Sequence, residues 1–272
     1  MDTDFLYKKI LPEVKNIATE VGRFQMRHFR SMNEEQQESK AQRELVSFVD
    51  VESEKLIKER LDLLIQNAGF YGEESGQSGN QDLVWVVDPL DGTTNFLCGL
   101  DLFSISIALV YEGDPILGVV ARPATGDLYY AVKGHGFYRN GIAIEERTPR
   151  PMHKCLIGTG MPFRSPDCRQ AYWPCADEVL ENSLGMRRFG SAALDLSFLA
   201  AGYLQGFWEI DLQPYDVAAG LLFLNESHCQ YSRFSGEDYQ IFGDRTFVAG
   251  IPDCYKTLQE ITHRHFQELG IK

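Results

Sequence analysis

Apolar residues in the first part of the chain recur at the three- and four-residue spacing of helices. The range Phe5 to Phe29 carries its apolar side chains at this period and therefore predicts an amphipathic helix. A second helix is expected from Asp50 to Asn67, with Asp50 at its start and Gly69 just beyond its end. The segment Ser31 to Glu44 between them is polar and charged without a period, which predicts a loop.

The middle of the chain changes to short apolar runs separated by turn residues, which is the pattern of β-strands. The strands expected here are Gly69 to Gly72, Val84 to Val87, Phe103 to Tyr111, Pro115 to Arg122 and Leu128 to Lys133. The glycine-rich stretch Gly134 to Gly141 could imitate a phosphate-binding loop. No helical pattern follows it, so a hairpin turn is favoured.

In the second half, short strands alternate with helices. The expected strands are Leu156 to Gly160, Met186 to Phe189, Gly206 to Ile210 and Thr246 to Gly250, and the expected helices are Cys168 to Glu181, Ser191 to Tyr203, Pro214 to Ser227 and Asp253 to Glu268. This alternation predicts a layered α/β arrangement. We treat residues 1–272 as a single domain, with an N-terminal lobe of about 1–150 and a C-terminal lobe of about 151–272.

Charge and composition narrow the classes of partner. The chain is 44% hydrophobic and 24% charged, with a formal net charge of −13, so its average field would repel nucleic acid. An anionic substrate would need a cation between it and the protein. The chain lacks an apolar run long enough to span a membrane, and its N-terminus lacks the apolar segment of a secretory signal. The six cysteines show no metal-type spacing, which is typical of reduced, mostly buried thiols, and a cytoplasmic location is expected.

Two carboxylates follow the apolar run Val84 to Val87. Pro89 cannot donate to a sheet ladder, so the strand is expected to stop near Asp88 and to leave Asp88 and Asp91 on a turn. Mg²⁺ is usually held by such carboxylates, and the adjoining Gly92-Thr93-Thr94 offers N–H groups and hydroxyls to a phosphate. By itself, however, an Asp-Pro-x-Asp-Gly string favours an ordinary turn.

Two more acidic positions favour a metal site over an ordinary turn. Glu73 follows a short strand, as Asp88 does, and the loop between the two strands is short enough for their ends to be neighbours. Asp216 begins a helix rich in small residues, which can approach a site closely. Each has an ordinary alternative, since Glu73-Glu74 alone suggests a solvated pair and Asp216 alone suits the helix dipole.

Together these motifs resemble the inositol monophosphatase family of magnesium-dependent, lithium-sensitive phosphatases. The resemblance covers nearly the whole chain and is closest to the bacterial type. Its motifs are Gly72 to Ser75, Trp85 to Phe96, Gly158 to Phe163, Arg187 to Asp195 and Tyr215 to Gly220. It implies a five-layer α-β-α-β-α sandwich, usually a homodimer, acting on a small phosphorylated polyol or sugar.

The resemblance also implies roles for individual residues. Glu73, Asp88, Asp91, Asp216 and the backbone oxygen of Leu90 would ligate about two or three Mg²⁺ ions. Glu73 and Thr93 would be catalytic, acting on a metal-activated water. The substrate would be bound by Asp91, Gly92, Thr93, Thr94, Arg187, Gly190, Ser191, Ala192, Glu209 and Asp216.

Some positions depart from the family pattern. Asp211 stands where relatives usually have glycine, close to Glu209, and Asp101 adds an acid after the Asn-Phe end of the main motif. These differences affect substrate preference. The leading hypothesis is hydrolysis of inositol monophosphate. The alternatives are a 3′-phosphoadenosine 5′-phosphate phosphatase, a fructose-1,6-bisphosphatase, or a regulatory or scaffold protein that retains the fold.

Overall fold

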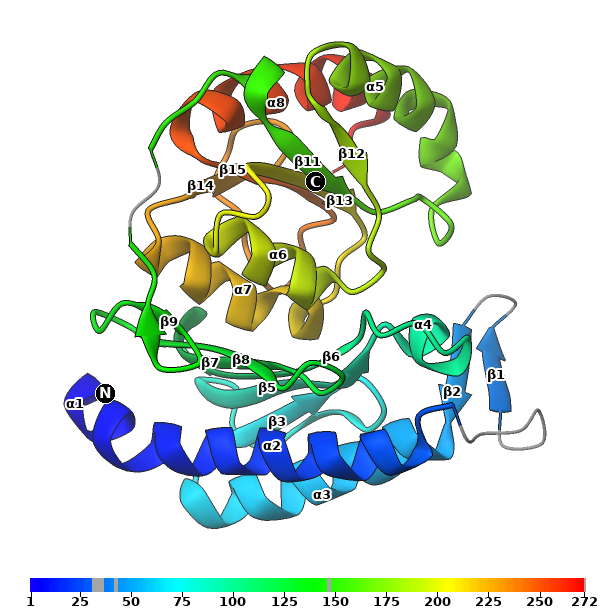
Figure 1. Cartoon of the computed structure of the whole chain (residues 1–272). Helices are drawn as coiled ribbons and strands as arrows, with labels where there is room; N and C mark the ends of the chain where they lie inside the picture. The colour runs from blue at the N-terminus through cyan, green and yellow to red at the C-terminus, as the bar shows by residue number, and fades with distance from the viewer. Residues whose placement is uncertain (31–36, 42–43, 146–147, 272) are drawn as a thin grey trace.

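The computed structural model describes residues 1–30, 37–41, 44–145 and 148–271. Figure 1 shows five layers: helices α2 and α3, a large sheet, helices α6 and α7, a second sheet, and helices α5 and α8. This is the α-β-α-β-α sandwich that the family resemblance implies, and it contains the layered α/β arrangement that the alternation of strands and helices predicts. The division into two lobes near residue 150 stays a prediction.

Helices cover the outer face of the large sheet. Their bounds are α1 Thr3–Phe5, a π-helical stretch η1 Leu6–Ile10, α2 Leu11–His28 and α3 Phe48–Leu64. Asp2 caps the first turn, accepting hydrogen bonds from the backbone N–H groups of Asp4 and Phe5. The apolar stripe predicted over Phe5 to Phe29 packs against the sheet through Val14, Ile17 and other buried residues. Both predicted helices are therefore confirmed.

The large sheet has eight strands in the order β10-β9-β8-β7-β6-β5-β3-β4. Their bounds are β3 Gly69–Gly72, β4 Gly76–Ser78, β5 Leu83–Asp91, β6 Ser104–Tyr111, β7 Asp114–Arg122, β8 Asp127–Val132, β9 Phe137–Arg139 and β10 Ile142–Ala143. Strands β3 and β5 are parallel, with Gly72 opposite Val87. The short helix α4, Thr93–Leu97, follows β5 directly.

The second sheet has five strands in the order β12-β11-β13-β15-β14. Its strands are β11 Leu156–Thr159, β12 Gly185–Arg187, β13 Gly206–Ile210, β14 Gln230–Ser232 and β15 Thr246–Gly250. The helices of this half are α5 Arg169–Glu181, α6 Ala192–Ala200, α7 Pro214–Glu226 and α8 Pro252–Phe266, with short 3₁₀ turns at η3 Met152–Lys154, η4 Pro166–Cys168 and η5 Gln267–Leu269.

Helices α6 and α7 lie between the two sheets, and one hydrophobic cluster joins all three layers. Val86 and Ala108 of the large sheet, Leu196 of α6 and Phe247 of the second sheet belong to this cluster. Gly220 of α7 allows the two helices to meet closely, because a Cβ there would lie 2.4 Å from the Leu196 side chain. The small residues after Asp216 thus serve helix packing.

Two predictions about extended segments are wrong. The strand after Val84 does not stop near Asp88 but runs to Asp91, through a bulge that accommodates Pro89. The expected loop Ser31 to Glu44 contains β1, Gln37–Ala41, which pairs in antiparallel fashion with β2, Glu44–Ser47. Residues 31–36 and 42–43 of that prediction lie outside the described residues.

Shorter elements also differ from expectation. The stretch Gly134 to Gly141, expected as one hairpin turn, contains strand β9, and the loop after Gly72 contains strand β4. Five of the six cysteines are buried and Cys98 is exposed, as expected for scattered thiols. In the part of the chain that the structure describes, none of the helices has both the length and the apolar character needed to cross a membrane.

Candidate active site and metal centre

The bulge in β5 places two carboxylates at the end of this strand of the large sheet. Asp88 is opposite Ser106 and Asp91 is opposite Ser104, so two residues on β5, Pro89 and Leu90, correspond to one residue on β6. The carbonyl of Pro89, inside the bulge, accepts a 2.7 Å hydrogen bond from Gln25 Nε2 of α2. Both carboxylates are buried, and this bond helps to hold the bulge that presents them.

Glu73 reaches the same place from the neighbouring strand. Because β3 and β5 are parallel, the residues after Gly72 and Val87 leave the sheet at one edge, and the Glu73 N–H donates to the Val87 carbonyl at 3.2 Å. Glu54 of α3 fixes the turn that follows, since its carboxylate accepts 2.8 Å bonds from the N–H groups of Glu74 and Ser75. Sequence reasoning did not identify Glu54, which is a buried acid within a helical pattern.

Asp216 lies in the first turn of α7. Its Oδ2 accepts a 2.7 Å hydrogen bond from the backbone N–H of Gln213, in a capping box that starts the helix. Pro214 occupies the first helical position, where no N–H is required. The local sequence therefore both begins the helix and aims this carboxylate at the end of β5.

Asp88, Asp91 and Asp216 offer carboxylate oxygens that all lie within 4.8 Å of one another. Hydrogen bonds fix each group from one side. Leu90 N–H donates to Asp88 Oδ1 at 2.9 Å, and the Ala193 N–H donates to Asp91 Oδ2 at 2.7 Å. The donor set consists of hard oxygens, which are the ligands that Mg²⁺ prefers.

The electrostatics of the cluster favour a cation. Burial, followed by the charge of Glu73, raises the pKa of Asp88 well above its usual range. Burial also raises the pKa of Asp91 and, well above its usual range, that of Asp216. Like charges held together away from water favour protonation or a bound cation. The cluster therefore fits a divalent metal ion.

The turn after Asp91 lies against the second half of the chain. Gly92 has φ of 95°, and a Cβ there would lie 3.0 Å from the Leu102 carbonyl oxygen and 3.1 Å from that of Gly190. Asn95 Nδ2 ties the same segments together, donating to the carbonyls of Leu102 and Phe189 at 2.6 and 2.7 Å. Thr93 Oγ1 donates to the Leu90 carbonyl at 3.0 Å.

One pocket joins these groups to the C-terminal half. The predicted site residues in its lining are Glu73, Asp88, Leu90, Asp91, Gly92, Thr93, Thr94, Gly190, Ser191, Ala192, Glu209 and Asp216. Burial raises the pKa of Glu209 to about 8, against the opposing effect of Arg188. Gly160 makes room for this side chain, because a Cβ there would lie 1.6 Å from Glu209 Oε1.

Arg187 is the predicted pocket residue that the structure places elsewhere. It ends the edge strand β12, is exposed, and donates from Nη1 to the carbonyl of Met186. Arg188 lines the pocket in its place, since successive side chains of an extended segment point to opposite sides. In a run of two arginines, sequence alone does not decide which one faces the site.

Sequence reasoning also missed Arg164 and Asp195. Arg164 lines the pocket, and its charge partly opposes the rise that burial causes in the pKa values of Asp91 and Asp216. Asp195 is buried in α6, and burial followed by the charge of Glu209 raises its pKa well above the usual range. Asp195 ends one of the motifs that carry the family resemblance, and Arg164 directly follows another, but only the packing shows where they face.

The two acidic departures from the family pattern have different surroundings. Asp101 is absent from the described pocket lining and lies 3.5 Å from Arg122 Nη2. Asp211 does line the pocket, and its carboxylate is held by Arg245.

Comparison with known proteins gives a consistent result. Residues 7–270 match the model of the inositol monophosphatase family. The chain is 38% identical over 245 residues to an inositol-1-monophosphatase of Rhizobium meliloti, covering 89% of this chain and 92% of the relative. It is 33% identical over 244 residues to Nus factor SuhB of Escherichia coli, covering 89% and 91%. The crystal structure of extragenic suppressor protein suhB from Bartonella henselae aligns with a TM-score of 0.88 at 34% identity, covering 93% of this chain and 98% of that chain.

Proposed function

Because the chain belongs to the inositol monophosphatase family, we propose that it hydrolyses inositol monophosphate and related small polyol or sugar phosphates. The observation that supports this most directly is the convergence of Asp88, Asp91 and Asp216 beside the turn at residues 92–94. Carboxylates hold divalent cations, and backbone N–H groups at such a turn bind phosphate oxygens. The two requirements of phosphate ester hydrolysis are thus met in one pocket.

The proposed cofactor is Mg²⁺, with about two or three ions per site. Its ligands would be Glu73, Asp88, Asp91, Asp216 and the backbone oxygen of Leu90. When bound, Mg²⁺ lowers the pKa of water and neutralises charge on the phosphate. Inhibition by Li⁺ is also expected, because the chain resembles lithium-sensitive phosphatases.

The chain's own residues supply positioning and proton transfer. Thr93 Oγ1 donates a 3.0 Å hydrogen bond to the Leu90 carbonyl, which holds its hydroxyl beside a backbone oxygen that we assign to the metal. We assign Glu73 and Thr93 to holding the attacking water, with the Glu73 carboxylate accepting its proton. Gly92, Thr93 and Thr94 hold the phosphate through their N–H groups, and Gly92 is the residue whose conformation permits this turn.

The alcohol part of the substrate lies toward the C-terminal half. Glu209 is placed to contact its hydroxyl groups, with the loop Gly190 to Ala192 beside it. Arg188 takes the role predicted for Arg187. This arrangement favours a monophosphate with neighbouring hydroxyls over 3′-phosphoadenosine 5′-phosphate or fructose 1,6-bisphosphate.

A substrate panel tests this proposal. Phosphate release from the three compounds named above is measured with the purified full chain in Mg²⁺, with and without Li⁺. Release from inositol monophosphate should be fastest, and both EDTA and Asp88→Asn should abolish it. Release that is unaffected by both treatments would refute the metal mechanism, and a strong preference for the nucleotide would refute the inositol assignment.

A regulatory role is the second candidate, because a relative covering most of this chain is named Nus factor SuhB. Asp88→Asn separates the two roles in cells, since it removes catalysis and keeps a side chain of the same shape. We also propose a homodimer, as the family resemblance implies, and a cytoplasmic location, as the scattered thiols suggest. Sedimentation of the full chain tests the dimer.

A further inference from the structure

Asp211 has a backbone conformation that few residues adopt. Its φ is 62°, in the left-handed region that glycine enters freely and that aspartate tolerates better than most side chains. Its side chain is only 14% exposed. A carboxylate therefore occupies a place where the backbone alone would favour glycine, and something must hold it there.

Arg245 holds this carboxylate. Its Nε donates to Asp211 Oδ1 and its Nη2 donates to Oδ2 at 3.1 Å, which makes a two-point ion pair. The backbones are also joined, because the Asp211 N–H donates to the Arg245 carbonyl at 2.6 Å. The Asp211 carboxylate, which accepts hydrogen bonds from the guanidinium, raises the pKa of Arg245, so this cation stays charged.

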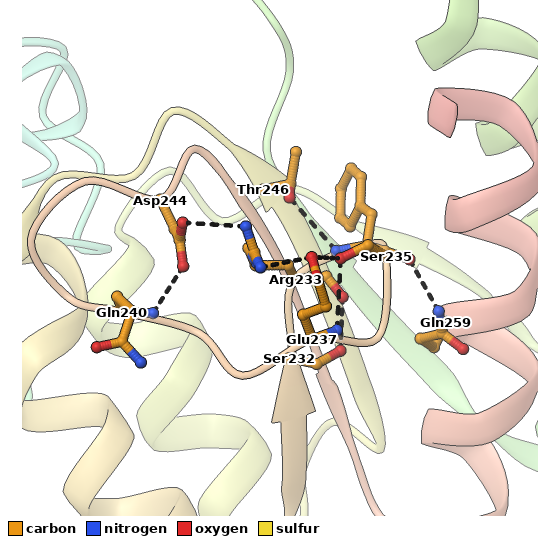
Figure 2. A network of polar contacts seen from close by, with 9 residues as sticks. Ser232, Arg233, Ser235, Glu237, Gln240, Asp244, Thr246 and Gln259 are labelled. Atoms are coloured by element: carbon orange, nitrogen blue, oxygen red, sulfur yellow. Dashed lines mark hydrogen bonds and ion pairs between the residues drawn. The ribbon is translucent and has the colours of Figure 1, made fainter. Parts of the chain in front are cut away.

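The loop that carries Arg245 is anchored on both sides of it. Figure 2 shows Asp244 beside Arg233. Their Oδ1 and Nη1 atoms are 3.7 Å apart, and Thr246 Oγ1 accepts a 3.3 Å hydrogen bond from the Phe234 N–H. Asp244 Oδ2 also accepts a 2.7 Å bond from the Gln240 N–H. These contacts fix the backbone from which the Arg245 side chain extends.

Asp211 stands between two hollows. It lines the metal pocket together with Glu209 and Arg188, and it also lines a second hollow that includes Arg245. Arg245 is absent from the described lining of the metal pocket. The carboxylate thus lies between this guanidinium and the substrate end of the site, and it occupies the donors that a second anionic group could use.

We propose that Asp211 is a specificity-determining residue that withholds Arg245 from the substrate and so selects ligands with one phosphate over ligands with two. This inference rests on the proposed function. A phosphate needs a cation or N–H donors to bind in an acidic pocket. The first phosphate has the turn at residues 92–94. A second one near Glu209 has Arg188 and Arg164 in the same lining, but it also meets the Asp211 carboxylate, which keeps Arg245 from it.

The test compares two substrates in one variant. Asp211→Gly suits the backbone at φ 62° and removes the two-point partner of Arg245, which keeps its 4.0 Å contact with Asp167. We expect the ratio of kcat/KM for fructose 1,6-bisphosphate to that for inositol monophosphate to rise about tenfold, the effect of one charge-assisted contact. The double variant D211G/R245Q should lose this gain. His228→Gly is the matched control, since His228 is exposed and has φ of 58°.

Binding supplies a readout that does not need turnover. Phosphonate analogues of the two substrates, whose P–C bonds are not hydrolysed, are titrated by calorimetry into the Mg²⁺-loaded wild type and variants. The ratio of their Kd values should shift as the kcat/KM ratio does. If the wild type hydrolyses neither substrate but the Kd ratio shifts, the proposed function fails, while the selection between ligands that we assign to Asp211 holds for binding alone.

Other outcomes overturn the inference. A kcat/KM ratio that stays within about twofold of the wild-type ratio in Asp211→Gly, or that rises equally in D211G/R245Q, means that Asp211 does not select through Arg245. Equal losses of kcat/KM with both substrates, accompanied by a lower Tm, indicate that Asp211 has a structural role alone. Analogues that bind to no variant contradict it as well.

Discussion

Ser191 Oγ donates a 2.6 Å hydrogen bond to Asp91 Oδ2, although the two residues are 100 positions apart in the chain. The same hydroxyl caps helix α6, accepting from the Leu194 N–H at 3.3 Å, and lies 3.0 Å from the Ser104 hydroxyl. One side chain therefore starts a helix of the second half and orients a carboxylate of the first. The metal cluster depends on the docking of the two halves.

Replacing Ser191 with alanine should affect stability and proton binding together. Loss of the cap should lower the free energy of unfolding by about 1 kcal/mol. The Ser191 hydrogen bond lowers the pKa of Asp91, so its loss raises that pKa further. Protons then compete better with Mg²⁺, and the acidic limb of the kcat/KM profile should move to higher pH.

Ser197→Ala is the control for this experiment. Ser197 is in the same helix, but its hydroxyl donates to the Ala193 carbonyl at 2.7 Å. It should change stability and leave the pH profile in place. Equal shifts in the two variants would show that the Asp91 contact has no special effect.

Asp88→Asn should stabilise the protein when no divalent cation is present. Asp88 is buried beside other carboxylates, which raises its pKa. Asparagine removes one of these charges at almost the same volume. Denaturant unfolding in EDTA at neutral pH should give a higher free energy of unfolding for the variant, and saturating Mg²⁺ should reverse the order.

The difference in unfolding free energy between Asp88→Asn and the wild type in EDTA should change with pH in one direction. A carboxyl group whose pKa is raised by folding contributes stability that is fully present below its unfolded pKa, near 3.8, and is lost as pH rises through the folded value. In EDTA the advantage of Asp88→Asn should therefore be absent in acid and grow toward neutral pH. A wild type that is the more stable protein in EDTA at neutral pH would contradict this account.

Much of the fold follows from patterns that the residues carry locally. The helical stripe over Phe5 to Phe29 and the alternation of strands and helices after Leu156 predict the layers. The parallel pairing of β3 and β5 brings Glu73 to the edge where Asp88 lies, as the short loop between them suggests. The proximity of these carboxylates is observed, while their catalytic roles remain predictions.

The features that sequence did not reveal depend on contacts between distant segments. Pro89 would end an isolated strand, but a bulge paired with β6 and held by Gln25 lets β5 continue. Whether Arg187 or Arg188 faces the pocket is set by how the end of an edge strand is oriented. The short strands β4 and β14 have weak patterns of their own and form because a longer neighbour pairs with them.

The ionisation of Glu209 should be visible in substrate binding. Its pKa of about 8 means that it is largely protonated at neutral pH and becomes charged above that value. The new negative charge repels an anionic substrate, so KM should rise severalfold as pH increases through about 8. Glu209→Gln cannot ionise, and its KM should lack this step. A step of the same size in both proteins would assign it to another group.

Gly160→Ala should act through Glu209. The added Cβ would lie 1.6 Å from Oε1 and 1.9 Å from Cδ, so the carboxylate must leave its position. We expect a rise in KM of about tenfold, similar to that of Glu209→Ala, with a smaller change in kcat. The double variant G160A/E209A should be no worse than either single variant. Additive losses would mean that Gly160 acts independently of Glu209.

Gly92→Ala should be the most damaging of the small substitutions. Alanine at φ 95° is strained by about 1–2 kcal/mol, and its Cβ would also press on the carbonyl oxygens of Leu102 and Gly190. Gly113→Ala isolates the first effect, because Gly113 has φ of 86° and a Cβ there meets nothing within 4 Å. Denaturant unfolding should therefore show a larger loss of unfolding free energy for Gly92→Ala than for Gly113→Ala.

Only Gly92→Ala should also lose kcat, by about a hundredfold or more, because the turn that holds the phosphate must shift relative to Asp91. Full activity in Gly92→Ala would show that this turn does not position the reacting group.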